Sequence, residues 1–101
     1  MKSSLKNPTK AEKRRFYLIK FEIGCLIHPN TPAEAHHLLR NGKRVSHLAT
    51  IPLCTECHTG SDSTHKRKVW FRETYGTDEE LLAETNRRVE EFESRTFGRV
   101  A

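Results

Sequence analysis

Residues 25–65 decide how this chain folds, and they read CLIHPNTPAEAHHLLRNGKRVSHLATIPLCTECHTGSDSTH. All six histidines and all three cysteines of the 101-residue sequence lie in this stretch. Imidazole and thiolate groups are the ligands that zinc prefers in proteins. A random distribution would not confine these side chains to one part of the chain, so we expect the fold to be organised around bound metal.

A first group of candidate ligands consists of two pairs with the same spacing, Cys25 with His28 and Cys54 with Cys57. Zinc takes four nitrogen or sulfur ligands in a tetrahedron, and two such pairs supply them. We predict a structural zinc that clamps the exit of the first helix to the end of the second strand. In the alternative interpretation, Cys25 is a small buried apolar residue and His28 a loop residue.

A second group contains His36, His37, His58 and His65. His36 and His37 are adjacent in a predicted strand, so their side chains point to opposite faces, and one can bind a metal while the other faces a substrate. Three imidazoles on one cation leave coordination positions open for a phosphate oxygen and water, as in catalytic sites. The alternative for the adjacent pair is two half-buried strand histidines.

Local patterns predict a small number of helices and strands. Thr9 with Glu12 and Thr77 with Glu80 form capping boxes that begin two helices. Asn41-Gly42 is a type I′ turn signal. The predicted elements are a helix over 10–22 ended by Gly24, strands over 35–39 and 48–53, a helix over 66–75 and a last helix over 78–94.

Length and composition point to one small domain that needs extra stabilisation. The chain is 35% hydrophobic, and domains of this size often add a metal or disulfides. Three cysteines cannot form a complete disulfide framework. No segment approaches the roughly 20 apolar residues of a membrane span, and Lys20 and Glu22 break the best N-terminal apolar run, so we expect no signal peptide and a cytoplasmic protein with no membrane partner.

The chain is basic, which suits a polyanionic partner such as nucleic acid. The formal net charge is +5 and the pI is about 9.4. Phosphate contacts from basic side chains give affinity without sequence preference and a strong dependence on salt. The candidate DNA-binding residues flank the predicted histidine site in sequence: Arg40, Lys43, Arg44, Lys66, Arg67 and Lys68. For any single one of them, ordinary solvated charge is the alternative.

Three segments, AEAHHLL (33–39), TIPLCTECHTG (50–60) and STHKR (63–67), resemble HNH endonucleases. The likeness is greatest to the Ref-type recombination-enhancement nucleases of phages and prophages, which act with RecA filaments. It covers about residues 25–90. It implies a single α+β domain over 1–101 with a ββα-metal, treble-clef-related core at about 25–75, an N-terminal helix and C-terminal helices.

The resemblance also implies roles for the histidines. His37 matches the general base, and His36, His58 and His65 match the ligands of a catalytic Mg2+, Mn2+ or Zn2+. DNA is the implied substrate, held in a RecA filament, while the oligomeric state is left open.

The sequence departs from the family pattern at two places. His65 follows His58 by seven residues rather than four, so a loop must separate them. Ala49 stands where the family has the asparagine that orients the base, and Thr50 or His47 is available to replace it.

Three functions are compatible with these features. The first is a metal-dependent DNA endonuclease active in recombination. The second, which the loss of the asparagine at Ala49 favours, is a non-catalytic zinc-stabilised module that binds nucleic acid. The third is a purely structural or partner-binding zinc domain, which the basic side chains disfavour.

Overall fold

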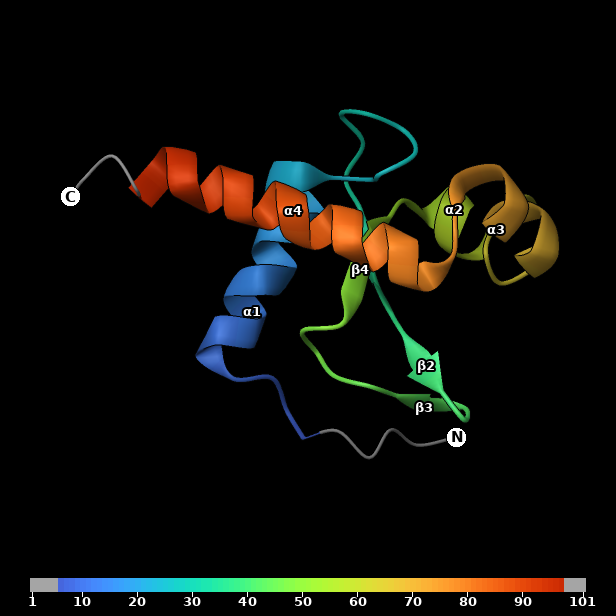
Figure 1. Ribbon diagram of the computed structural model, residues 1–101, viewed down its shortest axis with the longest axis horizontal. Helices are drawn as coiled ribbons and strands as arrows, with labels where there is room; N and C mark the ends of the chain where they lie inside the picture. The colour runs from blue at the N-terminus through green and yellow to red at the C-terminus, as the bar shows by residue number, and fades with distance from the viewer. Residues whose placement is uncertain (1–5, 98–101) are drawn as a thin grey trace.

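The computed structural model describes residues 6–97 and shows a small α+β fold (Figure 1). Short antiparallel strands lie between an N-terminal helix and a long C-terminal helix. In chain order the elements are α1 Lys10–Tyr17, η1 Leu18–Ile23, β1 Glu34–His37, β2 Leu39–Arg40, β3 Lys43–Arg44, β4 Thr50–Leu53, α2 Thr55–Thr59, α3 Lys68–Tyr75 and α4 Asp78–Phe97.

The first helix begins with both arms of its capping box in place. The Thr9 hydroxyl accepts from the Glu12 backbone N–H, and the Glu12 carboxylate accepts from the Thr9 N–H. After α1 the helix widens into a π-helix, η1, which the apolar pattern did not predict. Gly24 ends it with a φ of 75°, a conformation that glycine adopts without strain.

The two predicted strands pair with each other, and a second, two-residue ladder lies between them in the sequence. β1 pairs antiparallel with β4, with His36 opposite Ile51 and His37 opposite Thr50. The Asn41-Gly42 turn instead joins β2 to β3, and both residues have the positive φ of a type I′ turn.

A bulge in one strand separates the β1–β4 ladder from the β2–β3 ladder. The N–H of Leu38 bonds to the carbonyl of Ala49, while the N–H of Val45 bonds to the carbonyl of Leu38. Residues 46–48 therefore form a bulge opposite the single residue Leu38. This bulge shortens the predicted strands 35–39 and 48–53, and His47 lies within it.

Two of the three C-terminal helices pack against the β1–β4 pair, α2 against both strands and α4 against β4. α2 follows β4 directly, and α3 begins at Lys68 rather than at the predicted residue 66. α4 packs against β4 and η1 and crosses the molecule (Figure 1). Its buried side chains are Leu81, Thr85 and Val89.

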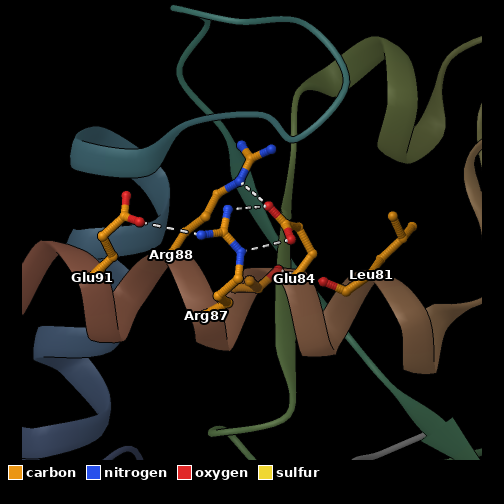
Figure 2. A network of polar contacts seen from close by, with 6 residues as sticks. Leu81, Glu84, Arg87, Arg88 and Glu91 are labelled. Carbon is orange, nitrogen blue, oxygen red and sulfur yellow. Dashed lines mark hydrogen bonds and ion pairs between the residues drawn. The ribbon is translucent and has the colours of Figure 1, made fainter.

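Side chains on the surface of α4 form a network of ion pairs. Arg87 and Arg88 both bond to the Glu84 carboxylate, and Arg87 also reaches Glu91 (Figure 2). These neighbours hold the pKa of Glu84 at about 2, mainly through the hydrogen bonds from Arg87. Exposed pairs of this kind contribute only a few tenths of a kcal/mol each.

The apolar core is small, and cysteines form part of it. Cys25, Cys54 and Cys57 are buried together with Ile51, Leu53 and Phe71. A core in which thiols replace aliphatic side chains buries less apolar area, which makes a bound metal energetically important. Within residues 6–97, no helix is both long enough and apolar enough to span a membrane.

Candidate metal centres

The first centre brings together Cys25, His28, Cys54 and Cys57. One ligand atom from each lies within 4.8 Å of all the others, and Nδ1 of His28 is 3.3 Å from Sγ of Cys54 and from Sγ of Cys57. A tetrahedral zinc site with bonds of about 2.3 Å places its ligand atoms roughly 3.8 Å apart. The four residues therefore form a cluster of a size and composition consistent with structural zinc.

Backbone geometry around Cys25 also fits a metal thiolate. The N–H groups of Ile27 and His28 both point at Sγ of Cys25, each at 3.4 Å. Burial acts against ionisation of this thiol, but backbone hydrogen bonds outweigh it and lower its pKa. Burial raises the pKa of Cys57, and the sulfur of Cys25 adds to the effect. A divalent cation at this position would supply the positive charge that lets all three sulfurs be thiolates.

The second centre brings together His36, His58 and His65. Their ligand nitrogens lie within 4.8 Å of one another, and their ring centroids are 5.0–5.3 Å apart. His36 comes from β1, His58 from α2, and His65 from the loop before α3, as the seven-residue spacing requires. His36 is buried, whereas His65 is exposed. The group is therefore open on the His65 side.

Two carboxylates contact this histidine group, and the sequence analysis did not identify either. Nδ1 of His58 donates to Glu34 Oε1 at 2.7 Å, which leaves Nε2 of His58 with a lone pair for a cation. Asp78 Oδ2 lies 3.3 Å from Nε2 of His36, and this contact lowers the pKa of Asp78. Glu34 lies only two residues before His36, and its position on the same strand face was the available signal.

His37 has a different set of neighbours from His36. Its Nε2 is 3.0 Å from Nδ1 of His47, and the edge of the Phe16 ring packs against both imidazoles. Burial lowers the pKa of His37 to about 4, and the positive charge of Arg44 acts in the same direction. His37 is thus a neutral imidazole at pH 7.

The six candidate DNA-binding residues are all exposed but differ in position. Arg44 acts electrostatically on His37, and Lys68 on His65 and Asp78, so these two lie closest to the histidines. Arg67 is already engaged, by Asp62 at 3.0 Å and by the Trp70 ring. The remaining three, Arg40, Lys43 and Lys66, lie on the β2–β3 hairpin and in the loop before α3.

A cavity of about 200 Å³ lies beside the second centre. Lys68 and Arg72, one turn apart on α3, line it together with Asp78. No sequence motif pointed to Arg72, because its place beside Asp78 depends on the packing of α3 next to the start of α4. The cavity brings two cationic side chains to the edge of the histidine group.

Comparison with known proteins gives no family: the chain matches no family model, and no curated protein or solved structure matches it significantly. The geometry of the two centres therefore carries the functional argument.

Proposed function

We propose that this chain is an HNH-type, ββα-metal DNA endonuclease that hydrolyses phosphodiester bonds. The observation that carries the proposal is the convergence of three imidazoles on one small, partly open site, next to a separate histidine on the same strand. The four other candidate ligands, Cys25, His28, Cys54 and Cys57, would form a closed structural zinc site. Metal-assisted hydrolysis needs a cation with open coordination positions, and a closed four-ligand site would stabilise the domain that carries it.

The roles of the residues follow from their positions. His36, His58 and His65 would hold a divalent cation, which when bound would stabilise negative charge on the scissile phosphate. His37 takes a proton from the water that attacks phosphorus, as a neutral imidazole can. Arg44 and Lys68 bind neighbouring phosphates. Such contacts favour cleavage without sequence preference.

The likeness to Ref-type nucleases supports a role in recombination with a RecA filament. Nicking reactions with and without RecA test this partner. The alternative, a zinc-stabilised module that binds nucleic acid without cutting it, is favoured by Ala49, which offers no side-chain donor or acceptor to orient a base.

Plasmid nicking tests the proposal. We expect the zinc-loaded protein to nick supercoiled DNA when Mg2+ or Mn2+ is added, with and without RecA and ATP in parallel reactions. His37→Ala should lower the rate by about 10²- to 10⁴-fold, the usual worth of a general base, while DNA binding persists. Glu90→Gln, an exposed change on α4, is the matched control and should nick normally.

Two results would reject the mechanism. Unchanged nicking by His37→Ala would remove His37 from the chemistry. DNA binding without nicking under every condition would favour the non-catalytic module instead.

A further inference from the structure

A chain of hydrogen bonds runs from the backbone to His37. Nε2 of His47 lies 2.7 Å from the carbonyl oxygen of Lys6, and Nδ1 of His47 lies 3.0 Å from Nε2 of His37. A carbonyl oxygen can only accept, so Nε2 of His47 must carry a hydrogen. In the neutral ring this leaves Nδ1 of His47 with a lone pair, and the hydrogen between the two rings then belongs to Nε2 of His37.

We propose that His47 is a positioning residue that fixes the tautomer of His37. The hydrogen bonds from the Lys6 carbonyl through His47 to His37 form a relay, and the Lys6 carbonyl is its fixed end. The inference rests on the proposed nuclease function. It assigns Nδ1 of His37 as the atom that receives the proton. The water oxygen forms its bond to phosphorus as its proton moves to Nδ1, the bond to the leaving oxygen breaks, and that oxygen takes a proton from solvent.

The surroundings hold His47 in place from two sides. The edge of the Phe16 ring on α1 packs against both imidazoles, with centroid distances of 6.0 Å to His37 and 5.6 Å to His47. The Thr50 hydroxyl donates to the His47 carbonyl at 3.1 Å, and Nε of Arg15 donates to that hydroxyl at 3.0 Å. His47 is itself buried. Both its ring and its backbone are therefore fixed by groups outside its own loop.

The relay accounts for the departure from the family pattern at Ala49. Ala49 contributes only its backbone, whose carbonyl accepts from the N–H of Leu38. An imidazole two residues earlier supplies the polar contact to the base instead. The segment before α1 thereby becomes part of the site, because the relay ends on Lys6.

Nuclear magnetic resonance tests the relay without reference to activity. The full-length zinc-loaded protein, labelled with 15N at histidine, reports which ring nitrogens carry hydrogen and whether two nitrogens share a hydrogen bond. We expect hydrogen on Nε2 of both His37 and His47, and an N–N coupling from Nε2 of His37 to Nδ1 of His47. A shared hydrogen assigned to Nδ1 of His47, or no coupling, would overturn the proposal.

Two variants connect the relay to catalysis. His47→Phe keeps a ring against Phe16 but has no polar atom, whereas His47→Gln keeps one acceptor and one donor. We expect His47→Phe to lower kcat for nicking by about 10- to 100-fold with little change in KM, as is usual for residues that orient a catalytic group. His47→Gln should recover part of that loss.

The outcomes separate the two proposals. Nicking by His47→Phe at the wild-type rate, in protein with normal zinc content, would refute the positioning role. Should His47→Phe fail to fold, the absence of coupling between Nε2 of His37 and Nδ1 of His47 in the wild-type protein would refute it equally. Absence of nicking by the wild-type protein refutes the nuclease, and the resonance measurement still decides the tautomer.

Discussion

Cys57 and His58 are consecutive residues of α2, yet each belongs to a different ligand group. Cys57 contacts His28 in the four-ligand cluster, and the His58 ring packs against the rings of His36 and His65 in the open one. α2 has only five residues, so a displacement of Cys57 moves His58 with it. We infer that a zinc ion bound by the four-ligand cluster would also fix the position of the His58 imidazole in the open group.

Removal of the structural zinc is expected to unfold the domain. Zinc sites of this type contribute about 10–16 kcal/mol in small peptides, which equals or exceeds the whole stability of most domains. We expect one tightly held zinc per chain by elemental analysis, and loss of the cooperative thermal transition after chelation.

Cys57→Ser separates the zinc effect from nonspecific chelator effects. The variant should lose zinc during dialysis and unfold at a markedly lower temperature. Thr59→Ala, an exposed change on the same helix, should keep both properties. A Cys57→Ser protein with normal zinc content and an unchanged transition would show that the four residues do not bind zinc together.

Glu34→Gln should weaken cation binding by His36, His58 and His65 while sparing the four-ligand cluster. The Glu34 carboxylate accepts from His58 at 2.7 Å and from the Thr55 hydroxyl at 2.9 Å, and removal of its charge makes His58 a poorer ligand. Loss of such a partner typically costs about 10- to 100-fold in metal affinity. Titration with Mn2+, followed by calorimetry, measures it.

Glu56→Gln is the matched control for that titration. Glu56, on α2, is an exposed carboxylate like Glu34, but it accepts from the Ser61 hydroxyl and not from a histidine. Equal Mn2+ affinities for the two variants would contradict the role given to Glu34.

Arg44→Ala should reduce the salt dependence of DNA binding. If Arg44 contacts a phosphate, its loss removes about one unit from the slope of log affinity against log salt. Arg95→Ala removes the same charge near the C-terminal end of α4, far from α2 and α3 (Figure 1), and should leave the slope unchanged. Binding to a short duplex, measured by fluorescence anisotropy at several salt concentrations, distinguishes them; identical slopes would place the DNA elsewhere.

Arg15→Ala should destabilise the fold more than Arg14→Ala. Arg15 is buried, and its guanidinium donates to the hydroxyl and the carbonyl of Thr50 at 3.0 and 2.8 Å. Loss of hydrogen bonds from a charged group, with buried acceptors left unpaired, costs about 1–3 kcal/mol. The exposed Arg14–Glu93 pair is worth less than about 1 kcal/mol. Urea unfolding of the zinc-loaded proteins gives the comparison, and equal losses would contradict it.

The sequence indicated those features that depend on neighbouring residues. Both capping boxes and the Asn41-Gly42 turn have the expected local geometry, because a few adjacent side chains determine each of them. The two ligand groups could also be proposed, since the spacing of cysteines and histidines limits which of them can share an ion.

Features that depend on distant segments were missed. Asp78 contacts His36 only because α4 starts beside β1. The Lys6 carbonyl contacts His47 only because residues 6–9 fold back over the bulge at 46–48. The π-helical turn of η1 also has no simple apolar period. Tertiary packing, which sequence spacing does not encode, sets all three.

The antiparallel register of β1 against β4 leaves this protein little tolerance for length changes in one short segment. Strand side chains alternate, and the connection over 38–49 holds His36 and His37 opposite Ile51 and Thr50, so deleting or adding one residue between Glu34 and His36 would turn the Glu34 side chain to the opposite face. The Glu34 carboxylate would then no longer reach Nδ1 of His58. Natural variants should therefore accept insertions at the β2–β3 tip far more readily than a single indel just before the paired histidines.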